Sequence, residues 1–506
     1  MKPLKGEITL LSLGQFPCEF GLRFLSSVLK ENHYSVKKLF LKQRFKDDVS
    51  LKIVEQINEF SRNSLFIGVS LMTEDIILAR NFAKKIRQFN KDIILVGGGI
   101  HPTVRPDEIM DDFDIAVAGE AEETILMLSE ELARGKRIKD IRLPTVNTKY
   151  HSSDEIGFVE DIDNLPYPDF SENFILKDGR VCLEKDYISL FGEDYNVLTS
   201  RGCPHACTYC VNSYYSENMD RRFFRKRSIG KIIDELRFAK ERYKIKTIAF
   251  VSDNFLSFSE RELNDFISLY GKEVNLPFVC VAAPNCIKED HIKRLMDIGL
   301  FRIGVGVESG SENTLNQYKR SHSSLKKIVE VAGILHKLHP RLGYSFDFIC
   351  DNPYETEDDL KKTISLLEAM PKTYDLDLFS LTFYPGTYLY DKAVQDGFIE
   401  DSYYLKKNKY YRRLNKSFYN FIILLYALKA NPKLIDFFMR CEPGKGMVAR
   451  VCKAIAANLT NVLLGASLLQ MVMFSIRHKN KAMVFYYIKF GFVAIKSSLL
   501  RWRKEK

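Results

Sequence analysis

Short apolar runs alternate with amphipathic stretches along the first 130 residues, and this alternation constrains the fold more than any other feature of the chain. Candidate strands lie at Ile8–Leu13, Val36–Leu41, Leu65–Leu71, Ile93–Val96 and Asp114–Ala118. Candidate helices lie between them at Phe20–Leu29, Leu51–Phe60 and Ile76–Phe89, and after the last strand at Glu120–Leu132. Strands that alternate with helices form parallel sheets with helices on both faces. The pattern predicts a doubly wound parallel sheet for residues 1–150.

Ligands of such sheets bind at the carboxyl ends of the strands, near the point where the strand order reverses. Two of these ends carry small polar residues, Ser70-Leu71-Met72-Thr73 and Gly97-Gly98-Gly99-Ile100-His101. Consecutive glycines let a backbone approach a large flat ligand or a phosphate, although such loops also serve only to turn a chain. The candidate contacts at this edge are Ser70, Thr73, Gly97, Gly98, Gly99, His101, Gly119 and Glu120. The last two fit a helix cap equally well.

A loop with three cysteines follows a later predicted strand. It reads Arg201-Gly202-Cys203-Pro204-His205-Ala206-Cys207-Thr208-Tyr209-Cys210, which is a C-x3-C-x2-C spacing. Thiolates on one short loop bind a soft metal, and three of them suggest an iron–sulfur cluster with one open iron. Zinc with His205 as an added ligand is the alternative, but the spacing fits zinc patterns poorly. We therefore expect Cys203, Cys207 and Cys210 to be the metal ligands.

The alternation of strands and helices continues through the middle of the chain. Candidate strands lie at Tyr195–Thr199, Thr247–Ser252, Phe278–Ala283, Arg302–Glu308, Tyr344–Cys350 and Leu378–Tyr384. Candidate helices lie at Ile229–Tyr243, Glu260–Tyr270, Glu289–Ile298, Ser324–Leu338 and Thr356–Ala369. Six such units predict a partial (β/α)6 barrel over residues 191–395, after a linker at 151–190. Barrel chemistry takes place at the carboxyl ends of the strands. The cysteine loop, Asp253, and Glu308 with Ser309 all fall there.

These motifs resemble those of radical S-adenosylmethionine (SAM) enzymes that carry an N-terminal cobalamin-binding domain. The cysteine spacing with Tyr209 before the last cysteine is the motif of that superfamily. Further landmarks are Arg225–Ser228, Val251–Phe255, Gly306–Gly310 and Tyr384–Thr387, and the matches cover residues 1–395. The resemblance implies a flavodoxin-like cobalamin domain over residues 1–150.

The resemblance also implies a [4Fe–4S] cluster on the three cysteines, with SAM bound to the open iron. Glu308 and Ser309 would contact the ribose or methionine part of SAM, Tyr209 its adenine, and Asp253 would lie with them. Glu308 has an alternative role, since a carboxylate at a strand end also caps a following helix.

The function implied by the resemblance is methyl transfer to an unactivated carbon. One SAM would be cleaved to a 5′-deoxyadenosyl radical that removes a substrate hydrogen, methylcobalamin would supply the methyl group, and a second SAM would remethylate the cobalt. An electron donor such as a flavodoxin or ferredoxin is implied. Two alternatives stay open: a cyclase or rearrangement enzyme of the same architecture without methyl transfer, and a non-catalytic, membrane-associated iron–sulfur or cobalamin carrier.

The sequence departs from its relatives at two places. The first-strand loop Ser12–Gly21 lacks the histidine of the D-x-H-x-x-G pattern. Either this loop does not ligate the lower face of cobalt, or the domain no longer binds cobalamin. Asp351–Thr356 replaces a Gly-Leu-Pro-Gly-Glu-Thr-like turn, and the loss of both glycines predicts an altered backbone. Methylthiotransferases are disfavoured, because only Cys18 precedes Cys182 and a second cluster would lack ligands.

The net charge of +10 belongs to one end of the chain. Residues 401–506 hold 21 Lys and Arg against 4 Asp and Glu, and residues 1–400 hold 54 against 61. We expect a mainly helical domain at 396–506. Its apolar run 454–476 has the length of a membrane span, but six polar residues argue against one.

Two interpretations of this tail remain: a helical cap over the barrel mouth, or amphipathic helices on an anionic membrane surface. The charge favours the membrane, and the small-molecule substrate would then be hydrophobic or lipid-like. The segment is too apolar for an exposed nucleic-acid surface. Three of the ten cysteines lie within eight positions and the others are scattered, which with no secretion signal indicates a reducing compartment. We therefore expect a cytoplasmic protein with peripheral membrane contact.

Overall fold

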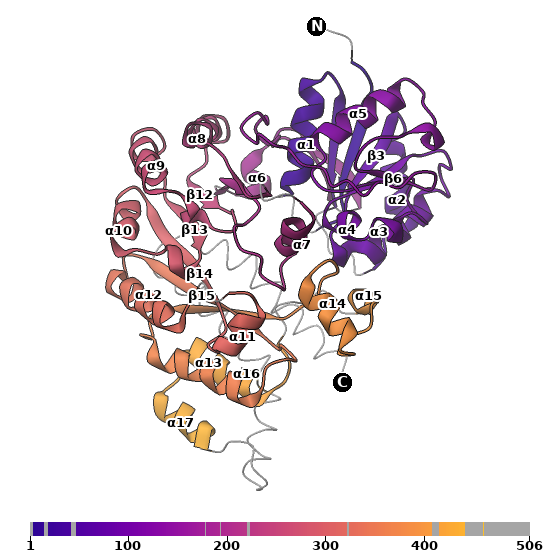
Figure 1. Cartoon of the computed structure of the whole chain (residues 1–506). Helices are drawn as coiled ribbons and strands as arrows, with labels where there is room; N and C mark the ends of the chain where they lie inside the picture. Colours follow the sequence, from indigo (N-terminus) through magenta and orange to yellow (C-terminus); the bar gives the residue numbers. More distant parts are fainter. Residues whose placement is uncertain are drawn as a thin grey trace. The chain divides into compact units, whose positions relative to one another are not determined.

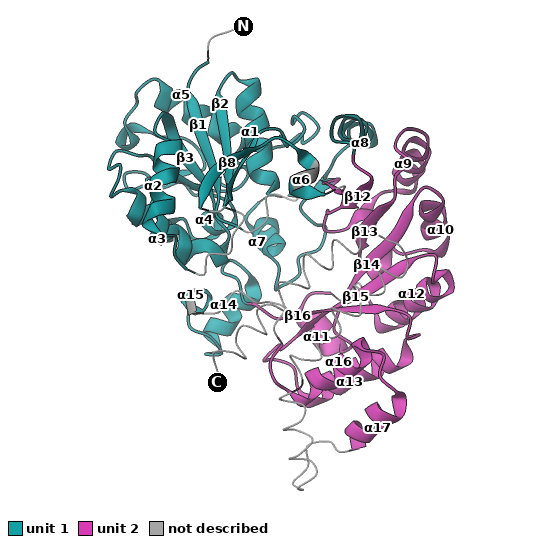
Figure 2. Cartoon of the chain, turned by 180° about the vertical axis from the view of Figure 1, so that it is seen from behind, with its two compact units in different colours: residues 1–192, 200–244, 383–408 teal, residues 193–199, 245–382, 409–506 magenta. Residues whose placement is uncertain are grey.

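The computed structural model describes residues 4–14, 19–41, 47–177, 179–192, 194–219, 223–320, 323–406, 414–440 and Leu459. The chain forms two compact units (Figures 1 and 2). Unit 1 comprises residues 1–192, 200–244 and 383–408, and unit 2 comprises residues 193–199, 245–382 and 409–506. The cysteine loop therefore belongs to the same unit as the N-terminal sheet, although the strand before it belongs to unit 2.

The sheet of unit 1 has the predicted doubly wound core. Its strand order is β6-β5-β4-β3-β1-β2-β7-β8, and the five strands from β5 to β2 are parallel. The strands are β1 (Glu7–Ser12), β2 (Ser35–Phe40), β3 (Ser64–Ser70), β4 (Leu95–Gly98), β5 (Ile115–Val117), β6 (Val146–Thr148), β7 (Asn173–Lys177) and β8 (Arg180–Glu184). The order reverses between β1 and β3, so a ligand site is expected at the carboxyl ends of these strands.

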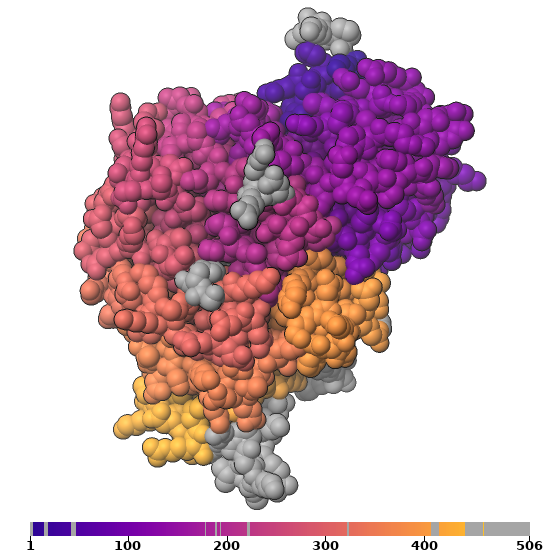
Figure 3. Space-filling model, in the orientation of Figure 1, coloured from indigo at the N-terminus to yellow at the C-terminus, as the bar shows by residue number. Residues whose placement is uncertain are grey.

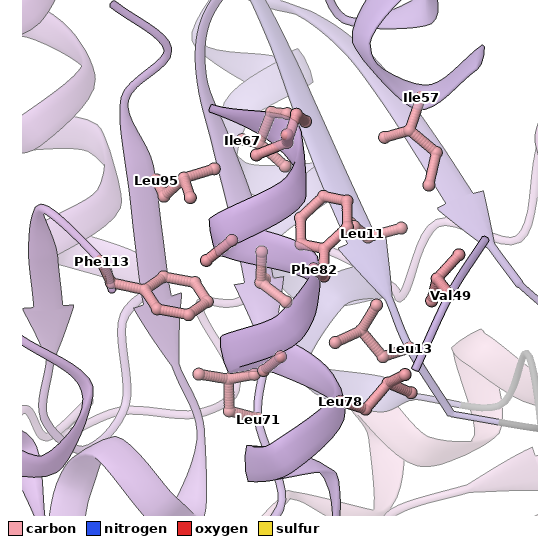
Figure 4. Packing of buried hydrophobic residues seen from close by; sticks show 14 of the residues in the cluster. Leu11, Leu13, Val49, Ile57, Ile67, Leu71, Leu78, Phe82, Leu95 and Phe113 are labelled. Carbon is pink, nitrogen blue, oxygen red and sulfur yellow. The ribbon is translucent and has the colours of Figure 1, made fainter. Parts of the chain in front are cut away.

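Helices cover both faces of this sheet, which explains why its strands read as continuous apolar runs. On one face Phe82 of α3 packs among Leu11, Ile67 and Leu95 (Figure 4). On the other face Leu10 packs with residues of α1 and α5. The helices of unit 1 are α1 (Phe20–Glu31), α2 (Leu51–Phe60), α3 (Ile76–Ile86), α4 (Ile100–Val104), α5 (Glu122–Ala133), α6 (Tyr187–Phe191), α7 (Val211–Asn218), α8 (Ile229–Tyr243), α14 (Tyr388–Gln395) and α15 (Tyr403–Lys406).

The segment that we expected to be a linker, residues 151–190, contains the hairpin β7–β8 and most of α6. Strand β7 pairs with β2 and extends the sheet. Two fully buried cations from the neighbouring elements hold this segment. Lys38 Nζ donates to the carbonyl oxygens of Asp169 (2.9 Å) and Ser171 (2.7 Å), and Arg23 donates to Asn173 Oδ1 (3.0 Å).

The sheet of unit 2 has six parallel strands in the order β16-β15-β14-β13-β12-β9, which confirms the partial (β/α)6 arrangement. Its strands are β9 (Asp194–Val197), β12 (Thr247–Phe250), β13 (Phe278–Ala282), β14 (Leu300–Glu308), β15 (Gly343–Cys350) and β16 (Asp375–Ser380). Its helices are α9 (Glu260–Glu273), α10 (Glu289–Asp297), α11 (Glu312–Gln317), α12 (Leu325–Leu338), α13 (Glu357–Ala369), α16 (Phe418–Ala427) and α17 (Pro432–Arg440).

The described part of the C-terminal region is mainly helical, as expected; α15 belongs to unit 1, and α16 and α17 belong to unit 2. Every residue of α16 is buried, and the helix packs against α13. Asp351 at the end of β15 accepts hydrogen bonds from Asn420 Nδ2 (2.6 Å) and from the backbone N–H of Asn415 (2.9 Å). Asp351 has φ +64°, in the left-handed region that glycine favours. The C-terminal region thus supplies two hydrogen-bond donors to the side chain of this residue, while the altered backbone expected at Asp351–Thr356 stays a prediction.

No helix among the described residues is long and apolar enough to cross a membrane. The apolar run 454–476 lies outside the described residues except for Leu459.

Candidate cofactor sites

The cysteine loop of unit 1 runs between a short β-ribbon and helix α7. The ribbon pairs β10 (Ser200–Arg201) with β11 (Arg225–Lys226) in antiparallel fashion. Gly202 follows β10 with φ +77°, and a Cβ there would lie 2.8 Å from the Phe223 ring and carbonyl oxygen. Only glycine fits this turn. Cys210 is the N-cap residue of α7, and its N–H donates to Cys207 O (3.0 Å).

The donor chemistry of the loop fits an iron–sulfur cluster. Cys203, Cys207 and Cys210 form no disulfide, and Cys207 is buried while the other two are partly exposed. In the described part of the chain, no three Cys, His, Asp or Glu side chains meet as ligands of a single ion. A four-iron cluster takes each thiolate on a different iron, so its ligands need not converge on one point. Tyr209 is partly exposed beside Cys210.

The three glycines after β4 have different roles. A Cβ on Gly97 would lie 2.5 Å from Ile109 Cδ1. Gly99 has φ +111°, and a Cβ there would lie 2.9 Å from Leu71 O. The fold thus requires glycine at Gly99, where the backbone itself is close, whereas a side chain at Gly97 would have to displace the tip of Ile109. Gly98 has no atom within 4 Å of its Cβ position. Of the three, Gly98 is the residue beside which a flat ligand can lie without displacing protein atoms.

The first-strand loop places a carboxyl group at the same edge of the sheet. Glu19 Oε1 accepts a hydrogen bond from Ser12 Oγ at the end of β1, and Ser70 at the end of β3 also bonds to Glu19. The second oxygen, Oε2, is buried and has no hydrogen-bond partner within the described residues. Burial raises the pKa of Glu19 to about 7, against the lowering effect of both serine hydroxyls. Glu19 was not among the predicted site residues, because a lone carboxylate in this loop matches no cobalt-ligand pattern such as D-x-H-x-x-G.

Replacing Glu19 with glutamine is expected to change the pH dependence of stability in the cofactor-free protein. The pKa of Glu19 rises from 4.5 to about 7 on folding, so the folded state binds more protons between these values and wild-type stability falls as pH rises through them. The penalty reaches at most about 3 kcal/mol above pH 7. Glu19→Gln should melt at a higher temperature than wild type at pH 8, and the gap should shrink toward pH 5. Parallel melting curves across this range would contradict the assignment.

His101 and Thr73 lie inside the protein rather than at the open edge. His101 is fully buried on α4, with Nδ1 3.4 Å from Thr73 Oγ1 and Nε2 3.5 Å from Glu108 Oε2. Tyr404 of α15 donates to Glu108, and its ring centroid is 5.7 Å from that of His101. Arg105 also binds Asp401 (2.8 Å). The segment with α14 and α15, orange in Figure 3, thus lies against the N-terminal part of unit 1.

Gly119 and Glu120 serve the structure of the loop after β5. Gly119 has φ +83°, and a Cβ there would lie 2.4 Å from the backbone nitrogen of Gly157. Glu120 accepts hydrogen bonds from Arg225 and from the N–H of Val159. The N-cap residue of α5 is Ala121, without a side-chain cap. Neither residue is therefore the helix cap that the sequence allowed.

The candidate SAM contacts of unit 2 follow its strands. Glu308, with φ +72°, ends β14 and lies 3.6 Å from Arg320 Nη1. It does not cap the next helix, because Ser311 caps α11. Ser309 is buried and donates to Glu355 Oε1 (3.1 Å), a carboxyl whose pKa burial raises to about 7. Asp253, after β12, is exposed. Asp253 is thus exposed to solvent, while Ser309 is buried and bonded to Glu355.

Comparison with known families finds two domain matches in this chain. Residues 6–128 match the B12 binding domain, and residues 197–367 match the radical SAM superfamily. The chain carries a radical SAM domain together with a B12-binding domain, as the resemblance of its motifs predicted. These domains imply a [4Fe–4S] cluster, SAM and cobalamin as cofactors.

Two curated relatives span most of the chain. An uncharacterized methyltransferase of Pyrococcus horikoshii is 25% identical over 389 residues, which are 75% of this chain and 79% of the relative. The bacteriochlorophyllide d C-8(2)-methyltransferase of Chlorobaculum tepidum is 22% identical over 372 residues, 72% of this chain and 75% of the relative. Among solved structures, the cobalamin-dependent SAM radical enzyme OxsB, with aqua-cobalamin and SAM bound, has a TM-score of 0.58 at 16% identity and covers 99% of this chain and 80% of its own. This likeness concerns the fold.

Proposed function

We propose that this protein is a cobalamin-dependent radical SAM methyltransferase that acts on an unactivated carbon of a small molecule. One observation carries the proposal: unit 1 contains both the loop with three disulfide-free cysteines and the sheet edge left open at Gly98. The methyltransferase relatives support methyl transfer over the cyclase and carrier alternatives.

Different residues of unit 1 would form the cluster site and the corrinoid site. Cys203, Cys207 and Cys210 would hold the cluster, and the turn at Gly202 presents them. Gly98 leaves room for the corrin ring, and Glu19 offers a buried oxygen beside it. When bound, the cluster supplies the electron that cleaves SAM, and cobalamin supplies the methyl group.

The SAM site draws on fewer side chains than the sequence suggested. We retain Glu308, Asp253 and Tyr209 as proposed contacts. We propose no direct SAM contact for Ser309, because its hydroxyl donates to Glu355. The side chains of His101, Thr73 and Glu120 are likewise engaged by protein groups, so their contribution is to shape the edge of the sheet.

The substrate class that we propose is a hydrophobic small molecule such as a tetrapyrrole. The bacteriochlorophyllide methyltransferase relative and the apolar, basic composition of residues 401–506 support this choice. The same composition supports contact with an anionic membrane surface. A reductant such as a flavodoxin or ferredoxin would supply the electron.

Anaerobic reconstitution tests the proposal. The protein is loaded with iron, sulfide and hydroxocobalamin, reduced, and supplied with SAM that carries a radiolabelled methyl group. We expect deoxyadenosine to form and the label to enter the protein-bound corrinoid. Deoxyadenosine without label in the corrinoid would favour the cyclase or rearrangement enzyme. Bound cofactors with neither product would favour the carrier.

A further inference from the structure

Two arginines of the ribbon before and after the cysteine loop bind two glutamates that follow β5. Arg225 Nη1 and Nη2 donate to Glu120 Oε2 (2.9 Å) and Oε1 (2.7 Å). Arg201 Nη2 donates to Glu122 Oε1 (2.5 Å), and its Nη1 lies 3.4 Å from Glu120 Oε1. Arg201 and Arg225 are also direct partners in the ribbon. We call these four residues the arginine–glutamate bridge.

The bridge is largely shielded from solvent. The side chains of Arg225, Arg201, Glu120 and Glu122 are 9%, 15%, 19% and 6% exposed. Burial opposes the ionisation of Glu120, but the hydrogen bonds and charges of Arg225 and Arg201 outweigh it and lower the pKa of this carboxyl. Buried charges are tolerated only when they are paired and hydrogen-bonded, and a two-pronged arginine–carboxylate contact defines orientation as well as distance. The bridge therefore fixes the ribbon in one position.

Arg225 lies in a socket built from the loop after β5 and the segment beside it. Its guanidinium carbon is 3.8 Å from the ring centroid of Phe158, and its Nη1 also donates to Val159 O. The N–H of Val159 donates to Glu120 Oε2 (2.7 Å). A Cβ on Gly157 would lie 2.1 Å from Glu120 O, so only glycine lets these two backbones meet. The socket exists in the fold apart from any contact with a cofactor.

The bridge acts on the cysteine loop from its first residue. Only Gly202 separates Arg201 from the first cysteine, and a side chain at that glycine has no room. At the other end of the loop, the hydroxyl of Tyr214 on α7 donates to Thr103 O (3.2 Å). The hydroxyl of Thr103 in turn accepts from Gly119 N (2.8 Å). Both ends of the loop are thus tied to the sheet edge at which Gly98 lies.

We propose that the arginine–glutamate bridge is a positioning element that sets the separation between the cluster on the cysteine loop and the corrinoid at the edge of the first sheet. The inference rests on the proposed function, because it needs both cofactors in one unit. Glu120, which the sequence suggested as a cofactor contact, acts through Arg225 instead. Fixed placement matters because a displacement of about 1 Å between reacting partners costs about 100-fold in rate.

The test measures the distance between the two cofactors and requires no turnover. The loaded, reduced enzyme holds two paramagnetic centres, the reduced cluster and Co(II), whose separation pulsed electron paramagnetic resonance reports. In wild type we expect one narrow distance. In Glu120→Gln and Arg225→Met we expect the distance to shift or its distribution to widen by about 1 Å. Arg225→Lys keeps the charge without the two-pronged contact and should be intermediate.

Matched controls are Glu123→Gln on the exposed face of α5 and Arg237→Met on α8, which change the same residue types outside the bridge. A merely stabilising bridge would lower the melting temperature or the cofactor content but leave the distance unchanged in the loaded fraction, and that result would overturn the proposal. If wild type itself binds no cluster or no corrinoid, the proposed function fails, and the inference fails with it.

Discussion

Replacing Cys207 with alanine is expected to abolish the absorption of the iron–sulfur cluster and the formation of deoxyadenosine, while corrinoid binding survives. Cys207 is the buried thiol of the cysteine loop, and its backbone carbonyl accepts the N–H of Cys210. Removing one of three thiolates leaves an iron without its protein ligand. The edge of the first sheet is built from other residues and keeps its shape. Iron content, visible absorption and hydroxocobalamin retention after gel filtration measure the three effects separately.

The control is Cys182→Ala, which removes an exposed thiol of β8 away from the loop. It should retain the full cluster content and wild-type deoxyadenosine formation. If Cys207→Ala keeps wild-type iron content and deoxyadenosine formation, the cysteine loop does not hold the cluster. The same experiment on Cys203 and Cys210 should give the same loss, because each thiolate is expected to bind its own iron.

Replacing Gly98 with leucine is expected to have the opposite effect, with corrinoid binding weakened and the cluster retained. The space beside Gly98 is empty, so a leucine side chain fits the cofactor-free protein and occupies the volume that we assign to the corrin ring. Overpacking a tight site costs about 1–3 kcal/mol, which corresponds to about 5- to 150-fold in affinity. Titration with hydroxocobalamin measures this change, and the thermal melt of the unloaded protein should stay close to wild type.

Gly230→Leu is the matched control, because Gly230 on α8 also has no atom within 4 Å of its Cβ position and is exposed. It should leave corrinoid affinity unchanged. Unchanged affinity in Gly98→Leu would place the corrinoid away from this glycine. Together with Cys207→Ala, this pair of variants separates two cofactor sites that share one unit.

The sequence predicts the parts of this fold that depend on periodicity. The central strands of the first sheet carry apolar side chains on two faces, as Leu10 and Leu11 do in β1, and that pattern can be recognised without a structure. The hairpin β7–β8 could not be predicted from the sequence, because the contacts that hold its segment come from Lys38 and Arg23 elsewhere in the chain. Polar anchors of this kind have no periodicity to read.

The candidate sites show the same division. Spacing alone selects the three cysteines, since they share one short loop. Spacing cannot distinguish Gly98, which has open space beside it, from Gly97, which is packed against side chains, or from Gly99, which the backbone requires. Nor can it show that Glu120 accepts hydrogen bonds from Arg225, which lies 105 positions later in the sequence. Such distinctions depend on which surfaces meet in three dimensions.

The contact between Asn420 and Asp351 has a practical consequence for anyone who trims this protein. A deletion of residues 401–506 would look like the removal of a basic appendage. It would instead take Asp401 and Tyr404 from unit 1 and strip α16 from the helix that it covers in unit 2. If that truncated protein no longer bound liposomes, the loss would have two explanations, a damaged fold and the removal of a membrane anchor. A truncation after Arg440 keeps all the helices α1 to α17. Liposome binding by that protein would then test membrane contact of residues 441–506 alone.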